Sequence, residues 1–546
     1  FGWVARGSRA ISSGANSIAV GEMPSSSGPP SIARGTGATA AGTDAIAVGT
    51  GASAAALGNT SIGGLSQSNG DRSTAVGYGA VANNDLNTSI GAVAINYGGL
   101  GATTIGAGSA TGNTDTTAVG HMSEAFGLNA TATGAFAHAN AAGSTAVGFA
   151  ADAVGANSFA GGNGAVSTGA ASVALGLGAN AATDNAVAIG NAATANGGNA
   201  VSIGFGNTAT GNGAVAIGDP NSAVGTGAVA IGENNTATGQ GAVAQGNANT
   251  ATGQAAVALG DSSIANGASA VALGLSANAA TDLSTAIGYS ADATGRQAIA
   301  IGPQAAASQT NDIAIGTFAT ASGNISMALG QGATASGLSS IAQGTGANAS
   351  ASSSIAQGTA ANAVGVDAIA IGAGSRAAAL GNTSVGGLSQ SNGDRSTAVG
   401  YGAVANNDLN TSIGAVAINY GGLGATTIGA GSATGATDAT AVGHMSEAFG
   451  LNSTATGAYA HANATGATAT GYNAIASGQD SLAQGVGSPA SGASSTALGA
   501  SASATGSAAT ATGVNSSAVG ANSAAYGAGS SASGDNSSAM GYASAA

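Results

Sequence analysis

The chain has 546 residues with 97 Gly, 5% charged residues and 3% aromatic residues, and this composition excludes both an ordinary disordered protein and an ordinary set of globular domains. Collagen is excluded as well, because Pro occurs only six times and Gly does not recur at every third position. The formal net charge of −14 excludes a nucleic-acid-binding surface, and the absence of Cys excludes disulfides and thiolate metal sites.

Residues 1–53 begin a pattern in which Gly recurs every seven residues. The pattern occupies Gly7, Gly14, Gly21, Gly28, Gly35, Gly42 and Gly49. A fixed short period indicates a solenoid whose repeat units cannot fold alone. The sequence starts at Phe1 without Met and has no run of about 18 apolar residues, so we expect a mature region or a fragment without a membrane-spanning helix.

Residues 54–141 form a cassette that recurs, with five substitutions, as residues 377–464. We interpret residues 57–70 and 100–106 as insertions, which in a solenoid become loops on one face and often bind ligands. The chain is thereby divided into five segments. They are repeats at 1–53, the first cassette at 54–141, regular repeats at 142–376, the second cassette at 377–464 and further repeats at 465–546.

The cassettes also contain the few side chains that could form a site. All four His lie there, at His121, His138, His444 and His461. We interpret them as exposed or stacked side chains copied with the cassette rather than as metal ligands or pH sensors. The candidate ligand surface comprises Asn16, Ser17, Asp71, Arg72, Asp394 and Arg395. For the two Asp-Arg pairs a local surface ion pair is the simpler role.

Residues 142–376 show the repeat most clearly. Residues 228–255 read AVAIGENNTATGQG and then AVAQGNANTATGQA, and Gly recurs every 14 residues from Gly176 to Gly372. The alternation in residues 228–231 (AVAI) is typical of a strand, and Gly supplies the corner that follows it. The sequence therefore predicts an all-β, two-sheet parallel solenoid with about 39 coils of strand, turn, strand and turn.

Side-chain parity assigns the faces of both strands. The residue two before each Gly is almost always Ala, as at Ala188 and Ala195, whereas its neighbours are Val and Ile in one strand and Thr, Ser or Asn in the other. Burying the Thr layer without partners would cost about 1–3 kcal/mol per group, so we expect Ala inside and Thr in water. The Val and Ile stripe is then left outside and needs a partner, which predicts an oligomer of this chain.

The residues expected to pack on the axis of that oligomer are Val187, Ile189, Val201, Ile203, Val215, Ile217, Val229, Ile231, Val257, Leu259, Ile299, Ile301, Ile313 and Ile315. Polar residues interrupt this pattern at Gln245, Gln343, Gln357, Gln484 and Arg34. Our hypothesis is that the glutamines form polar rings on the axis and fix the register between chains, as buried polar residues do in coiled coils. The alternative is a loose axis at which the amides reach water.

Residues 16–21 (NSIAVG), 185–190 (NAVAIG), 515–520 (NSSAVG) and 536–541 (NSSAMG) resemble the NSVAIG motif of the YadA-like head of trimeric autotransporter adhesins from Gram-negative bacteria. The resemblance covers nearly the whole chain. It implies a left-handed parallel β-roll and a homotrimeric rod that attaches to host matrix, cells or abiotic surfaces and can associate with itself. It also implies display on the cell surface, tethered to the outer membrane by a C-terminal anchor outside this sequence.

Other function classes find less support in the sequence. We expect no enzyme, cofactor or metal, because no acid–base pair, nucleophile or metal-ligand spacing is present and no GxG string precedes an amphipathic helix. Ice binding through Thr-x-Thr rows is an alternative, favoured by Thr208 and Thr210 but interrupted at Val224 and Ile264. An unanchored extracellular or phage fibre is the other alternative.

Overall fold

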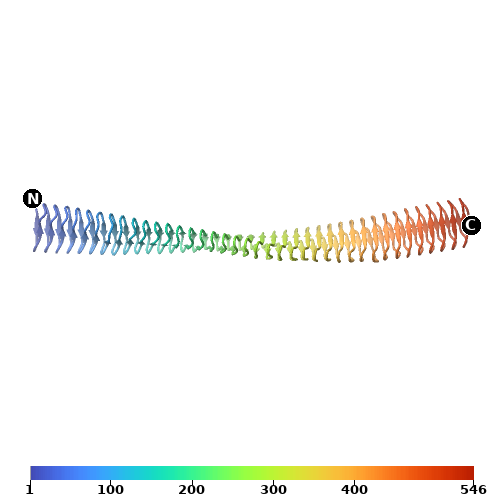
Figure 1. Ribbon diagram of the computed structural model, residues 1–546, viewed down its shortest axis with the longest axis horizontal. Helices are drawn as coiled ribbons and strands as arrows, with labels where there is room; N and C mark the ends of the chain where they lie inside the picture. Colours follow the sequence, from blue (N-terminus) through green and yellow to red (C-terminus); the bar gives the residue numbers. More distant parts are fainter. Residues whose placement is uncertain (1) are drawn as a thin grey trace. The chain divides into compact units, whose positions relative to one another are not determined.

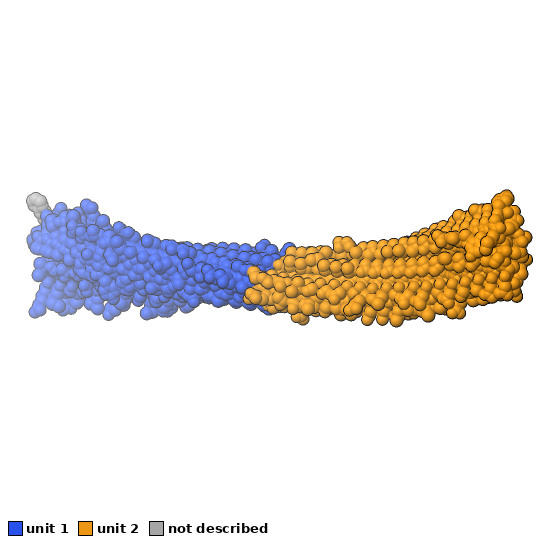
Figure 2. Space-filling model, turned by 45° about the vertical axis from the view of Figure 1, so that its right-hand side comes forward, with its two compact units in different colours: residues 1–273 blue, residues 274–546 orange. Residues whose placement is uncertain are grey.

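The computed structural model describes residues 2–546, which contain 77 β-strands and no helix. Two strands make one coil, so the strands amount to about 38 coils, which confirms the predicted parallel β-solenoid. The chain divides into two compact units, residues 1–273 and 274–546 (Figure 2). Within each unit the coils follow one another in sequence order (Figure 1). Since residues 2–546 contain no helix, none of them forms a helix that could cross a membrane.

Each coil pairs with the next coil 14 residues along the chain. The odd-numbered strands form one sheet and the even-numbered strands form the other. In unit 1, β27 (Val187–Ile189) pairs in parallel with β29 (Val201–Gly204), and β28 (Thr194–Ala195) pairs with β30 (Thr208–Ala209). In unit 2, β43 (Ile299–Ile301) pairs in the same way with β45 (Ile313–Ile315). Equivalent residues of successive coils therefore form columns along each unit.

The space between the two sheets is filled mainly by Ala. Ala188 of β27 and Ala195 of β28 are fully buried, as the parity of the sequence predicted. The residues two positions earlier, Ala186 and Ala193, are fully buried as well. A methyl group is the smallest side chain that excludes water, so the two sheets can approach closely and each coil needs only a few residues to close.

Glycine at the corners is required by the spacing of the coils. Gly190 directly follows β27 and has a φ of 125°, which residues other than Gly rarely adopt. A Cβ atom there would overlap the carbonyl group of Gly204 in the next coil. At the other corner, a Cβ atom on Gly197 would overlap the carbonyl of Gly211. The 14-residue glycine period thus reflects backbone contact between neighbouring coils.

The cassettes keep the same register, which corrects one prediction. Ser53 pairs with Gln67, and Thr60 pairs with Thr74, so residues 57–70 contain no insertion. The extra glycines in that segment lie inside a coil of ordinary length. Between residues 97 and 102 the coil is longer by one residue, because Thr88 pairs with Thr103. The second cassette shows the same shift between its equivalent strands. The second predicted insertion is therefore a single residue at a turn.

The coil with the extra residue has a polar core. The Nδ2 group of Asn96 donates to the hydroxyls of Thr104 and Thr111, both at 2.6 Å, and the two hydroxyls lie 2.8 Å apart. All three side chains are fully buried. Asn419, Thr427 and Thr434 repeat the arrangement in the second cassette. These hydrogen bonds offset part of the cost of removing the groups from water, although Oδ1 of Asn96 and of Asn419 accepts no hydrogen bond.

A column of four buried asparagines runs through the regular repeats of unit 1. It comprises Asn207, Asn221, Asn235 and Asn249. The Nδ2 group of Asn235 donates to the carbonyl oxygens of Ile231 and Gly246 at 3.0 and 2.7 Å, and its Oδ1 accepts the backbone N–H of Asn249 at 3.0 Å. The neighbouring strands β33 (Val229–Glu233) and β35 (Val243–Asn247) have five residues instead of three. The side-chain amide thus forms hydrogen bonds with backbone groups at the corner next to these longer strands.

We expect Gly232→Ala to lower the melting temperature of the chain. Gly232 has φ of 119°, and an added Cβ atom would overlap the carbonyl of Gly246. Strain of this kind costs about 1–3 kcal/mol. The matched control is Gly241→Asn, because Gly241 has φ of 65°, which Asn tolerates, and a Cβ atom added there would meet no other atom within 4 Å. Equal melting temperatures for the two variants, followed by circular dichroism, would contradict the packing argument.

We expect Asn235→Ala to destabilise the regular repeats of unit 1. The substitution leaves the N–H of Asn249 and two carbonyl oxygens without their side-chain partner, and an unpaired buried polar group costs about 1–3 kcal/mol. Asn247→Ala is the control, because Asn247 is exposed in the adjacent coil. Exchange of the backbone amide hydrogens in residues 221–249 should be faster in Asn235→Ala than in the parent chain, and unchanged in Asn247→Ala. Unchanged exchange there would show that water replaces the amide without loss.

Candidate functional site

The predicted axial residues all lie on the outward face of the odd-numbered sheet. Val215 and Ile217 of β31 (Val215–Asp219) stand beside Val201 and Ile203 of the preceding coil, so the side chains form two apolar columns. All fourteen predicted residues are half-buried except Ile315, which is 40% exposed. Rows of side chains run lengthwise over the surface of unit 2 (Figure 2). Within the regular repeats, these residues thus form an apolar face on each unit.

On this face, one strand carries a large and a small residue side by side. Phe159 and Gly161 occupy the two outward positions of β23 (Phe159–Gly161). Gly161 is buried, and a Cβ atom on it would come within 2.6 Å of the Phe159 ring and 2.9 Å of the Leu175 side chain. The large ring therefore lies over the space that the missing side chain leaves. The large and the small residue are thus complementary within this one strand.

The glutamines that interrupt the apolar columns are exposed. Gln343 of β49 (Ile341–Gln343) and Gln357 of β51 (Ile355–Gln357) occupy neighbouring coils, and the Nε2 of Gln357 donates to the Oε1 of Gln343 at 3.2 Å. Gln245 lies between Ile231 and Leu259. Gln484 and Arg34 are also exposed members of the same column. The bond between Gln343 and Gln357 of the same chain was not predicted, although their spacing of 14 residues places them side by side in successive coils.

Only one of the two N-terminal candidates for ligand binding is accessible. Asn16 is exposed at a corner with φ of 61°. Ser17 is fully buried, and its hydroxyl donates to the carbonyl of Gly14 at 2.7 Å and bonds to the hydroxyl of Ser12 at 2.7 Å. Placing Ser17 on a ligand surface was therefore wrong, because the second residue of the NSVAIG-like motif points into the coil.

The Asp-Arg pairs do not form the expected ion pairs. Within residues 2–546, neither Arg72 nor Arg395 forms a salt bridge. Instead, Asp71 Oδ1 accepts the backbone N–H of Leu57 at 3.2 Å, and Asp85 Oδ1 accepts the N–H of Asp71 at 2.7 Å. Each carboxylate thus caps the corner of the preceding coil, and the guanidinium of Arg72 is left without a charged partner.

A small pocket lies at this corner in both cassettes. In unit 1 it has a volume of about 250 Å³ and is lined by Leu57, Asp71, Arg72, Asp85 and Leu86. In unit 2 its equivalent, of about 240 Å³, is lined by Leu380, Asp394, Arg395, Asp408 and Leu409. Asp71 and Arg72 were predicted from the sequence, but Asp85 and the two leucines were not, although the spacing of 14 residues places the two aspartates in one column.

The histidines are stacked or paired on the surface. His121 contacts Phe136 edge-on with ring centroids 5.3 Å apart, and His444 contacts Tyr459 in the same way. These two therefore confirm the interpretation as stacked side chains. Among residues 2–546, no group of three His, Asp or Glu is arranged to hold a metal ion.

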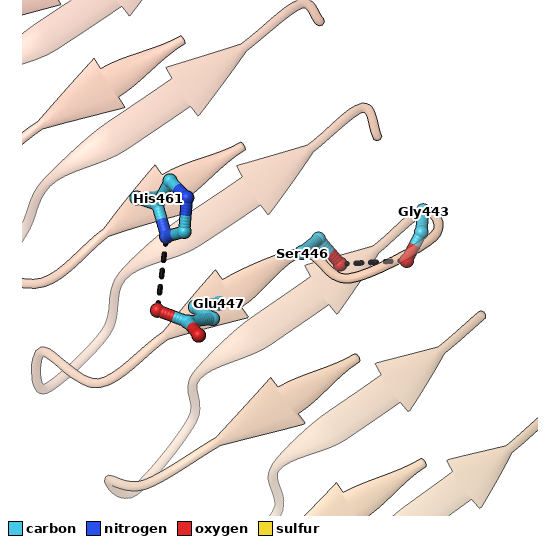
Figure 3. Close-up of polar contacts among 4 residues, drawn as sticks. All are labelled: Gly443, Ser446, Glu447 and His461. Atoms are coloured by element: carbon cyan, nitrogen blue, oxygen red, sulfur yellow. Dashed lines mark hydrogen bonds and ion pairs between the residues drawn. The ribbon is translucent and has the colours of Figure 1, made fainter. Parts of the chain in front are cut away.

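The second pair of histidines lies on the even-numbered sheet. His461 of β66 (His461–Ala462) bonds through Nδ1 to Oε2 of Glu447 in β64 (Glu447–Ala448) at 2.9 Å (Figure 3). On the adjacent turn, the Ser446 hydroxyl donates to the Gly443 carbonyl at 3.0 Å. His138 occupies the equivalent position in the first cassette, between Glu124 and Asp152 in its column. The sequence did not predict these pairings.

A family model of the YadA head domain repeat (two copies) matches most of the chain. The matches cover residues 26–52, 54–83, 112–137, 167–193, 195–219, 223–375 in overlapping pieces, 383–403 and 433–544, again in overlapping pieces. No curated protein matches the chain. The matches span both cassettes and the regular repeats, and their overlap follows the register of successive coils. The chain therefore belongs to the family of YadA head domain repeat proteins.

Proposed function

We propose that this chain is the head of a trimeric, surface-displayed fibre that attaches to host matrix, cells or abiotic material and can associate with itself. The observation that carries the proposal is the apolar face that the odd-numbered strands form in the regular repeats, in a chain built from YadA head repeats. We assign the fibre no catalytic activity and no cofactor. Its place is the cell surface, through an anchor supplied by sequence outside this chain.

The apolar face supports the trimer. Most coils of the regular repeats expose two aliphatic side chains on it, and burying each one fully contributes about 1.5–3 kcal/mol. Such a face far exceeds the apolar patch of a typical soluble monomer. Three identical chains around one axis, the arrangement that the family resemblance implies, would cover the face of every chain with the same contacts.

The remaining faces are suited to attachment. The even-numbered sheet presents half-buried Thr columns such as Thr194, Thr208 and Thr236, and the corners carry the charged and aromatic side chains of the cassettes. In the trimer, Gln245, Gln343, Gln357 and Gln484 would lie near the axis. There the exposed amides of neighbouring chains can bond to one another or to water and set the register between chains.

We expect Ile217→Asp to break the trimer, because it places like charges together on an apolar axis. Thr236→Asp should leave assembly unchanged, since Thr236 lies on the opposite, wet sheet. Native mass spectrometry measures the state of assembly, and circular dichroism confirms that each chain still contains its strands. If both variants assemble equally well, the assignment of the two faces is reversed.

We expect the assembled chain to bind saturably to at least one surface in a panel of matrix proteins, cultured cells and polystyrene. Because three linked copies act together, the Ile217→Asp variant should bind that surface about 100-fold more weakly. Thr236→Asp serves as the matched control for added charge. An assembled chain that binds none of these surfaces would overturn the adhesive function.

A further inference from the structure

We propose that the corner pocket of each cassette binds one neutral sugar ring of a glycan. This inference rests on the proposed adhesive function and names a class of ligand for it. The pocket in unit 1 is formed by Leu57, Asp71, Arg72, Asp85 and Leu86, and the pocket in unit 2 by the equivalent residues.

The polar groups of the pocket are held in place but remain able to bond. Asp71 and Asp85 each use Oδ1 to accept a backbone N–H, and this bond orients the carboxylate. No hydrogen bond within residues 2–546 engages their Oδ2 atoms or the Arg72 guanidinium. One pocket thus offers two oriented acceptors and a planar group of donors. Adjacent sugar hydroxyls donate and accept at once, so they match such a pair of groups.

The two leucines provide the apolar part of the site. Leu57 and Leu86 are 41% and 56% exposed, and they flank the charged side chains. The C–H face of a sugar ring can cover part of this surface, which adds the hydrophobic contribution that exposed polar groups alone lack. The volume of about 250 Å³ is below the range of roughly 300–1,000 Å³ usual for drug-sized ligands, so the pocket suits a single ring.

The charges of the pocket favour a neutral ligand over an anionic or a cationic one. An anionic group would meet Arg72 but also two carboxylates, in a chain with a net charge of −14. A lysine or arginine side chain would meet the carboxylates, yet its charge would repel Arg72 and leave the guanidinium unpaired. A neutral polyol satisfies all three groups without either conflict. The single-ring contacts would be weak, and the two pockets of each chain add avidity.

The test uses variants that the corner tolerates. Arg72 has φ of 56°, and the equivalent corner positions of later coils hold Asn129 and Asn157 with φ of 58° and 56°. The double variant Arg72→Asn with Arg395→Asn therefore removes both guanidinium groups and keeps the backbone. Leu86→Asn with Leu409→Asn removes one apolar wall from both pockets. Asp184→Asn is the matched control, because Asp184 caps the N–H of Ala170 at the same corner, where the pocket residues are absent.

The assembled proteins are applied to an array of immobilised neutral glycans and to an array of Lys-rich and Glu-rich peptides. We expect the parent protein to bind at least one neutral glycan and each double variant to bind that glycan at least 10-fold more weakly. The Asp184→Asn control should bind it as the parent does. The inference would be overturned if the parent protein bound no glycan, or if the Asp184→Asn control lost as much glycan binding as the double variants. It would also be overturned if the double variants lost binding only to the peptides. If the parent still attaches to matrix, cells or polystyrene in that case, the adhesive function stands and only the sugar site fails.

Discussion

The backbone contact between successive coils is the constraint on which the rest of the structure depends. Gly190 must lack a side chain because the carbonyl of Gly204 occupies that space, and the same contact recurs at both corners. The strands themselves are short, three residues in β27 and two in β28, and the space between the sheets is filled mainly by methyl groups such as those of Ala188 and Ala195. Neither strand can then bury a large aliphatic residue inside its own coil. The Val and Ile side chains lie on the outside instead, where the chain itself leaves them partly exposed.

The same constraint explains how much the sequence could predict. The regular spacing of Gly and the alternation within residues 228–231 were sufficient to predict the coil, the register between coils and the inward face of the strands. All three features depend on a local pattern that repeats along the sequence. The supposed insertion at 57–70 was wrong because extra glycines do not lengthen a coil, and only the pairing of Ser53 with Gln67 reveals this. The NSVAIG-like motif suggests a surface position for Ser17, but the parity of the strand places this second residue of the motif inside the coil.

The candidate site was harder to predict because its members come from different coils. Asp71 and Arg72 are adjacent in sequence and suggested an ion pair, whereas the structure pairs Asp71 with the backbone of Leu57 and brings Asp85 beside it. Contacts between residues 14 apart decide the chemistry, as with Gln343 and Gln357 or Glu447 and His461. A search for residues of matched chemistry at that spacing would have found these pairs, but not the pocket, whose shape depends on the corner backbone.

Two columns of amides show how position determines what a polar side chain can do. Asn235 is buried, and its donor and acceptor groups are taken by Ile231, Gly246 and Asn249 of the same chain. It stabilises the coil and has nothing left for a partner. Gln343 lies outside and accepts one hydrogen bond, from Gln357 in the next coil, and its side chain is exposed. An unsatisfied amide on an apolar face is costly when covered unless the covering chain supplies its bonds. The exposed glutamines would therefore restrict how any covering chain packs on this face, whereas the buried asparagines constrain only the chain that contains them.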